Sequence, residues 1–333
     1  MLILTAEEVR KALPMRDAIE AMKRAYGALS DGRAQVPLRV QIPIAPHGGL
    51  TLFMPAFVQA PEGESLAESL AIKVVSLFPE NPARGLAYIQ AAVLVLEPES
   101  GRALALLEGS SLTAIRTGAA SGAAIDLLAR KESRVVGIIG AGTQARTQLE
   151  AACTVRKIEH VFIYDSHPDK ARVFANEMAG RGPIPEAVSV AANASEAVQE
   201  ADIICTATTS PNPVFEDSAV RAGTHISAIG SYTPGMQEVP ADTIARARVV
   251  VDSRTACLEE AGDLIQPLRA GRFDASHIHG ELGEIVLGRK AGRVSADQIT
   301  YFKSVGVAVQ DAVAAQVALD NARRMKLGQE VAF

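Results

Sequence analysis

The sequence predicts an α/β fold in two domains, and three observations support this prediction. The chain has 333 residues, which is long enough for two domains of ordinary size. From about residue 134 onward, short apolar runs alternate with helical segments, a pattern typical of a doubly wound parallel sheet. One run, Arg134–Ala145, passes from a buried strand through a glycine turn into a helix. We therefore expect a Rossmann-like sheet preceded by a smaller α+β domain.

The composition is that of a compact globular protein and argues against several classes. Hydrophobic residues make up 48% of the chain and charged residues 21%. A formal net charge of −5, with no lysine or arginine tract, argues against a nucleic-acid partner. No apolar run reaches the roughly 18 residues of a membrane span, and the first residues lack the long apolar core that is expected of a signal peptide. The three scattered cysteines suit a reducing compartment, so we expect a cytoplasmic protein without a membrane partner.

The first part of the chain is expected to form two helices and then a small sheet. Thr5 is a typical helix cap because acidic residues fill the turn after it. A second helix with one apolar face is expected from about Asp17. Four apolar runs separated by proline and glycine turns then predict strands, at about 36–43, 50–54, 70–77 and 88–96.

Three cations stand out in or after these strands. Lys73 interrupts an apolar run, where burying an unpaired ammonium group would be costly. Arg39 alternates with apolar residues and is expected on the open face of its strand; either residue also has an interpretation as an ordinary solvated side chain. Arg116 lies in a helix of small residues, 107–124, in which an isolated arginine usually meets a buried acid or a ligand anion.

The glycine turn carries a dinucleotide fingerprint of the form G-x-G-x-x-A. Gly140 permits the tight turn, Gly142 lets the backbone approach a pyrophosphate, and Ala145 lets the helix pack on its strand. Asp165 follows the next apolar run at about the 20-residue spacing expected of an acid that binds the adenosine ribose. An acid there repels a 2′-phosphate and favours NAD over NADP, although Arg172 leaves some NADP use open.

The remaining strands and their ends complete the predicted nucleotide domain. Apolar strands are expected at about 134–139, 160–164, 186–191, 202–206, 224–229 and 248–252. Ligands in such sheets bind beyond the carboxyl ends of the strands, where this chain has hydroxyl- and glycine-rich segments at 206–211, 230–235 and 252–255. These segments suit contacts to the nicotinamide ribose and ring, and the alternative is simple turn chemistry.

The last part of the chain is expected to be helical. A helix and turn are predicted at 281–292, and a long final helix is predicted to start at Thr300 and return to the first domain. Its opening, Ser304–Gly306, can present backbone amides to a ligand. Asp311 on this helix is either a buried partner for an arginine or lysine, or an exposed residue. His277 and His279 lack a third ligand, so no metal site is expected.

Several separated segments resemble the ornithine cyclodeaminase/mu-crystallin family, over essentially the whole chain. The matching segments are Pro37–Arg39, Met54–Ala56, Lys73, Arg84–Gly85, Leu112–Gly118, Gly140–Ala145, Thr206–Thr209, Pro234–Gly235 and Lys303–Gly306. The resemblance implies that Arg39, Lys73 and Arg116 bind a substrate α-carboxylate. It also implies a substrate-binding and dimerisation domain at 1–120 with 305–333, and an NAD(P)-binding domain at 121–304 in a homodimer.

One segment departs from the cyclodeaminase pattern. Ornithine cyclodeaminases resemble one another in having Gly-Gly-Asp-Cys-Pro-Gly-Lys after the fifth strand, whereas this sequence has Tyr232 at the aspartate and Met236 at the lysine. A phenol cannot replace a carboxylate as the partner of an ammonium group at neutral pH. The chain is therefore more similar to members that reduce cyclic ketimines, such as Δ1-pyrroline-2-carboxylate to L-proline or Δ1-piperideine-2-carboxylate to L-pipecolate. The alternatives are an ornithine cyclodeaminase, an alanine dehydrogenase-like enzyme, and a non-catalytic NAD(P)H-binding protein of the crystallin type.

The expected reaction is reduction of a C=N bond beside a carboxylate with NAD(P)H, NADH being favoured. Lys73 is the main candidate for the proton donor, because desolvation and neighbouring cations lower the pKa of a lysine. Tyr232, or a water held by Thr233, is the alternative donor, and Arg116 completes the catalytic set. Ser304 and Gly306 are expected to join the three cations in binding substrate. The residues expected to bind the cofactor are Thr117, Gly140, Gly142, Thr143, Gln144, Ala145, Asp165, Thr206, Ala207, Thr208, Gly230 and Ser231.

Overall fold

The computed structural model describes residues 1–61 and 68–332 and divides into two compact units. The first unit comprises Met1–Arg116 with Val307–Phe333, and the second comprises Thr117–Gly306. The sequence predicts the changes of domain at 120 and 304, and the structure has them at 116 and 306. The functions assigned to the two domains stay predictions.

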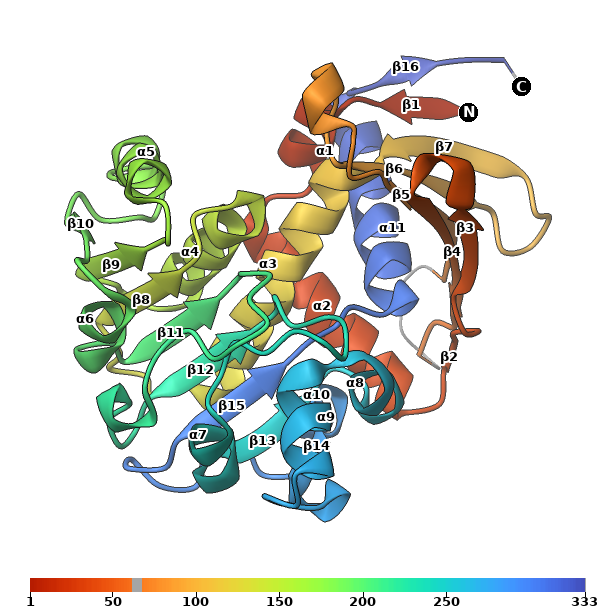
Figure 1. Cartoon of the computed structure of the whole chain (residues 1–333). Helices are drawn as coiled ribbons and strands as arrows, with labels where there is room; N and C mark the ends of the chain where they lie inside the picture. Colours follow the sequence, from red (N-terminus) through yellow and green to blue (C-terminus); the bar gives the residue numbers. More distant parts are fainter. Residues whose placement is uncertain (62–67, 333) are drawn as a thin grey trace. The chain divides into compact units, whose positions relative to one another are not determined.

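The first unit is a mixed sheet with helix α11 packed on β4, β5 and β6, and helix α2 packed on α11 (Figure 1). Its strand order is β16-β1-β7-β6-β5-β4-β2, and β3 pairs with β4. The helices are α1 (Ala6–Ala12), α2 (Met15–Ser30) and α11 (Ala308–Met325). The strands are β1 (Leu2–Leu4), β2 (Ala34–Gln35), β3 (Val40–Ile44), β4 (Gly49–Val58), β5 (Ser69–Leu77), β6 (Ile89–Leu96), β7 (Ala103–Glu108) and β16 (Gln329–Glu330). The predicted cap is present, because Thr5 and Glu8 form a capping box at the start of α1.

The second unit is an eight-stranded sheet in the order β10-β9-β8-β11-β12-β15-β13-β14, with every neighbouring pair parallel. The strands are β8 (Val135–Ile139), β9 (His160–Tyr164), β10 (Val188–Val190), β11 (Ile203–Thr206), β12 (His225–Ala228), β13 (Arg248–Val251), β14 (Ile278–Glu281) and β15 (Thr300–Lys303). The helices are α4 (Thr143–Val155), α5 (Pro168–Met178), α6 (Ala194–Gln199), α7 (Ala241–Arg246), α8 (Arg254–Glu260), α9 (Gly262–Arg269) and α10 (Leu282–Val286). Two apolar clusters bury the sheet, which confirms the predicted Rossmann-like fold.

Helix α3 (Gly109–Leu128) carries the chain from the first unit into the second. Its small residues allow the close packing that the sequence predicts. A Cβ atom on Gly118, for example, would collide with the backbone of Thr147 on α4. The carboxyl end of α3 is held by Arg156, whose guanidinium donates to the carbonyl oxygens of Ile125 and Ala129. In the described part of the chain, no helix combines the length and apolarity needed to span a bilayer.

The segment that follows residue 299 differs from the prediction of one long helix. Thr300–Lys303 forms strand β15, inserted between β12 and β13, and α11 begins only at Ala308. All four residues of β15 are buried, and the β-branched Thr300 and the aromatic Tyr301 and Phe302 favour a strand over a helix. Gly306 then takes a positive φ of 83°, which ends the extended segment before the helix. The helix and turn predicted at 281–292 are present, because α10 ends at Val286 and turn residues follow it.

Candidate active site

The three predicted carboxylate ligands come together in the first unit. Lys73 lies in the middle of β5, and Arg116 lies in α3. Both bind Asp311 of α11: Lys73 Nζ lies 2.7 Å from Oδ2, and Arg116 Nε lies 3.0 Å from Oδ1. Arg39, in the segment before β3, is close enough for its charge to lower the pKa of Lys73. Asp311 is therefore a buried ion partner, as one of the two interpretations of the sequence expected.

The alternation of side chains along β5 places Lys73 in the interior. Ala71, Lys73 and Val75 are buried, whereas the residues between them are half-buried on the other face. Packing of α11 on β5 brings Asp311 opposite the lysine. Gln310, beside it, accepts a hydrogen bond from Arg116 Nη1 at 3.0 Å and donates to the Tyr26 hydroxyl at 2.7 Å. The guanidinium is thus held in one orientation by two side chains.

The electrostatics of this cluster favour an anionic ligand. Burial lowers the pKa of Lys73 to about 8; Arg116 and Arg39 lower it as well, while Asp311 opposes the shift. Burial would raise the pKa of Asp311, but Arg116 and Lys73 outweigh burial and lower it. Among the described residues, Lys73 and Arg116 thus share the one ionised carboxylate of Asp311, and the pair keeps a net positive charge. A ligand carboxylate would balance the excess positive charge with charge-assisted hydrogen bonds.

The glycine fingerprint lies in a cleft of about 540 Å³ in the second unit. Gly140 has a φ of +97°, and a Cβ atom there would lie 2.7 Å from the carbonyl oxygen of Ala207, so glycine is required. A Cβ atom on Gly142 would meet nothing within 4 Å, which leaves its side open for a ligand. No side chain caps the amino end of α4, and its free N–H groups suit a pyrophosphate. These residues fit a dinucleotide.

Asp165 follows β9 and lines the same cleft. Its carboxylate accepts hydrogen bonds from the backbone N–H groups of Ala141 and His167, both at 2.8 Å, and so fixes the glycine turn. Arg172, which left NADP use open, pairs instead with Asp169 on the surface. The cation that lines the cleft is Lys170, which the sequence did not single out.

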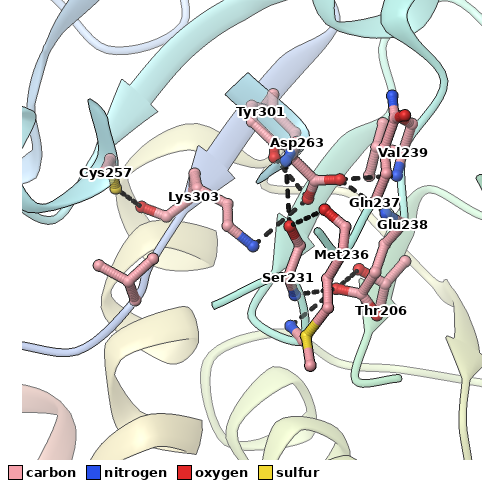
Figure 2. Close-up of polar contacts among 12 residues, drawn as sticks. Thr206, Ser231, Met236, Gln237, Glu238, Val239, Cys257, Asp263, Tyr301 and Lys303 are labelled. Atoms are coloured by element: carbon pink, nitrogen blue, oxygen red, sulfur yellow. Dashed lines mark hydrogen bonds and ion pairs between the residues drawn. The ribbon is translucent and has the colours of Figure 1, made fainter. Parts of the chain in front are cut away.

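Four predicted cofactor ligands surround the carboxylate of Glu238, which no local sequence pattern marks. Thr206, Thr208, Gly230 and Ser231 all donate hydrogen bonds to Glu238. Figure 2 shows Thr206 and Ser231 beside this carboxylate. The Thr206 hydroxyl and the amides of Gly230 and Ser231 therefore have a partner within the chain. Thr208 also lines the cleft beside Gly140, as does Ala207, the next residue after Thr206.

The predicted substrate donors at Ser304–Gly306 also have an internal partner. The Ser304 hydroxyl donates to Asp252 at 2.7 Å, and the amides of Val305 and Gly306 donate to it at 2.9 and 2.8 Å. Asp252 directly follows strand β13, so these bonds tie the segment after β15 to the end of the neighbouring strand. The expectation that these amides are presented to a ligand is therefore not supported by their geometry.

The other predicted residues occupy varied environments. Thr143 is exposed at the first turn of α4, and Ala145 is fully buried as the third small position of the fingerprint. Gln144 Oε1 is buried without a hydrogen-bond partner among the described residues. The carbonyl oxygen of Thr117 accepts a bond from Gln148. Tyr232 is half-buried on the loop after β12, and no metal-binding group of histidine, cysteine or acidic residues occurs in the described chain.

A doubly wound parallel sheet with a glycine-rich cleft, in one chain with a buried cationic cluster, defines a Rossmann-like α/β protein that is suited to an anionic ligand. The chain belongs to the ornithine cyclodeaminase/mu-crystallin family, whose model matches residues 1–326.

Several enzymes of this family are similar to this chain over nearly the full length of both chains. A Δ1-pyrroline-2-carboxylate reductase of Bacillus cereus is 42% identical over 334 residues, covering 100% of both chains. The structure of Thermococcus litoralis Δ1-pyrroline-2-carboxylate reductase in complex with NADH and L-proline has a TM-score of 0.92 at 43% identity, covering 99% of this chain and 100% of that one. An archaeal alanine dehydrogenase dimer with bound NAD has a TM-score of 0.90 at 36% identity, covering 100% and 99%.

Proposed function

We propose that this chain reduces Δ1-pyrroline-2-carboxylate to L-proline with NADH, and accepts the six-membered Δ1-piperideine-2-carboxylate as a second substrate. The observation that carries the proposal is the buried cluster in which Lys73 and Arg116 share Asp311 and retain excess positive charge. Such a cluster suits a substrate carboxylate next to the reacting carbon. The full-length similarity to two reductases of this name supports the same substrate.

In this proposal the chain contributes orientation and a proton. Arg116, held by Asp311 and Gln310, presents its remaining N–H groups to the carboxylate together with Arg39. Fixing the carboxylate orients the imine carbon, an effect that can supply several kcal/mol of the barrier reduction, up to about 7–11 kcal/mol. A bound NADH would supply the hydride. Lys73 Nζ holds the proton that passes to the imine nitrogen, so that the C=N bond becomes CH–NH.

The acidity of Lys73 predicts how the rate depends on pH. Only the protonated lysine can donate, and its pKa is about 8. We therefore expect kcat/KM for the imine to fall as pH rises through about 8. Steady-state rates measured across this range test the prediction. The substrate imine has its own titration, so Lys73→Arg is the control: arginine stays protonated and should remove this limb from the profile. If kcat/KM of Lys73→Arg falls over the same pH range as that of the wild type, the titrating group is the substrate imine and not Lys73.

The preference for NADH is proposed from Asp165, whose carboxylate lines the cleft and would repel a 2′-phosphate. Replacing Asp165 with serine is expected to raise the KM for NADH about tenfold, through loss of a charged hydrogen-bond acceptor, and to improve the use of NADPH. Comparing kcat/KM for both cofactors measures the change. Lys170→Ala is the matched variant, since it should weaken the binding of NADPH without weakening that of NADH. A wild-type protein that already prefers NADPH would contradict the assignment of Asp165.

The competing activities are separated by one set of assays. NADH oxidation is followed with Δ1-pyrroline-2-carboxylate and, separately, with pyruvate plus ammonia, and proline formation is followed with L-ornithine and NAD. Fast turnover of the cyclic imine alone supports the proposal. Activity only with pyruvate and ammonia would favour the alanine dehydrogenase alternative, for which there is a 36% identical archaeal relative. Proline from ornithine would show that Tyr232 does not exclude cyclodeamination, and NADH binding without any turnover would favour a binding protein.

We also propose that two copies of the chain associate through the first unit. The face of its sheet opposite Lys73 carries half-buried apolar side chains on three neighbouring strands, among them Phe53, Phe57, Ile72, Val74 and Leu94. An apolar sheet face of this kind suits a symmetric contact with a second copy. The alanine dehydrogenase relative is a dimer. Sedimentation at the mass of one 35.0 kDa chain would contradict the proposal.

A further inference from the structure

A single buried carboxylate ties together two loops that leave neighbouring strands of the second unit. Glu238 Oε1 accepts from the amide and hydroxyl of Thr208, at 2.6 and 2.9 Å, in the loop after β11. Oε2 accepts from the Thr206 hydroxyl at 2.9 Å and from the amides of Gly230 and Ser231 at 2.7 and 3.2 Å, in the loop after β12. Five donors, one from the last residue of β11 and four from the two loops, thus converge on one side chain.

Glu238 is itself held by a second buried carboxylate (Figure 2). Asp263 lies near the start of α9. Its Oδ1 accepts hydrogen bonds from the backbone N–H groups of Glu238 and Val239, at 2.6 and 3.1 Å. Its Oδ2 accepts from the Tyr301 hydroxyl at 3.0 Å and from Lys303 Nζ at 3.3 Å. The loop after β12 is therefore fastened at both ends and linked to strand β15.

Stability alone gives a poor reason for such a network. Glu238, Asp263 and Lys303 are each 0% exposed, and taking three charged groups out of water costs on the order of several kcal/mol each. Apolar side chains of similar volume often stabilise a protein as well or better. What an apolar core cannot do is hold two polar loops in one fixed register, because it offers their amides no acceptor.

The loops that Glu238 joins carry two residues that the sequence predicts for the site, Thr208 as a cofactor ligand and Tyr232 as the alternative proton donor. Thr208 lines the dinucleotide cleft, and Tyr232 follows directly after the two amides that Glu238 accepts. We propose that Glu238, backed by Asp263 and Lys303, is a positioning residue that fixes both loops together for hydride transfer. This inference rests on the proposed reductase activity. Loss of Glu238 would then misplace Thr208 and Tyr232 at once without removing any group that touches the reactants.

Glu238→Gln in the full-length protein tests the proposal. Whichever way the amide turns, its NH2 group must face a backbone N–H, either that of Thr208 or those of Gly230 and Ser231. Asp202→Asn is the matched control, because Asp202 also accepts two backbone amides but does so at the opposite ends of the strands. Thr206→Val removes one of the five donors while keeping the side-chain shape, and serves if Glu238→Gln does not fold.

We expect Glu238→Gln to lower kcat by about tenfold or more per folded molecule and to raise the primary isotope effect with deuterated NADH. Hydrogen exchange should quicken at 206–210 and at 230–236 together, while Asp202→Asn changes neither kcat nor these segments. Faster exchange in only one segment, or a wild-type kcat and isotope effect in Glu238→Gln, would overturn the proposal. If the wild-type protein reduces no imine, the reductase assignment fails separately. In that case, hydrogen exchange in Glu238→Gln still tests whether Glu238 couples the two loops. Faster exchange at both 206–210 and 230–236 supports the coupling, and unchanged exchange overturns it.

Discussion

Replacing Arg116 with alanine is expected to lower kcat/KM for the cyclic imine by about two to three orders of magnitude, while the Kd for NADH stays within about twofold. Arg116 is 6% exposed and held by Asp311 and Gln310, so it offers the substrate carboxylate a pre-oriented charged donor. Truncating one partner of such a buried pair costs about 2–5 kcal/mol, and the loss should raise KM as well as lower kcat. Steady-state kinetics and a fluorescence titration with NADH measure the two effects.

Two further variants separate the role of Arg116 from general damage. Arg116→Lys keeps the charge but loses the planar set of donors, and should recover only part of the activity. Arg102→Ala removes an exposed arginine that pairs with Glu97, and should leave both constants near their wild-type values. Thermal melting shows whether each variant is folded. Unchanged kinetics in a folded Arg116→Ala protein would remove the carboxylate site from the mechanism.

The features that the sequence predicts well are those that depend on neighbouring residues. The glycine fingerprint is local, since the positive φ of Gly140 and the start of α4 follow from a few adjacent residues. The six predicted strands of the nucleotide domain are present because each is an apolar run between turn residues. Lys73 and Arg116 are recognisable because each is a lone charge in an apolar or small-residue segment.

The features that were missed depend on residues far apart in the sequence. Glu238 lies in a loop, and its partners come from 206–208 and 230–231, so no local pattern marks it. Lys303 carries the same signal as Lys73, a cation in a buried apolar run, but the pattern predicts a helix there because the four-residue strand β15 runs almost directly into α11. The choice between an exposed and a buried Asp311 required the packing of α11 on β5, which the helical pattern alone cannot give.

Removing the charge of Asp311 is expected to have the largest effect on stability. Asp311→Asn leaves Lys73 and Arg116, which are 2% and 6% exposed, without their shared counter-ion. Breaking a buried pair from one side typically costs about 3–5 kcal/mol in the free energy of unfolding, because a buried charge stays uncompensated. Urea unfolding of the wild type and the variant at neutral pH measures the difference. Asp320→Asn, on the exposed side of the same helix, is the matched control and should change stability by no more than about 0.5 kcal/mol.

The pH dependence distinguishes this electrostatic cost from a packing defect. The pKa of Asp311 is lowered in the folded protein, so its contribution is present above its unfolded value of 3.8 and is lost as pH falls through the lower folded value. The deficit of Asp311→Asn should therefore shrink at strongly acidic pH. Without the carboxylate of Asp311, the pKa of Lys73 in the folded variant should fall further below its ordinary value of 10.5. As pH rises from that lowered pKa toward 10.5, the folded state carries a neutral amine while the unfolded state is still protonated. The free energy of unfolding of the variant should therefore increase over this range. A deficit that is constant across pH would indicate lost packing and would contradict the ion-pair account.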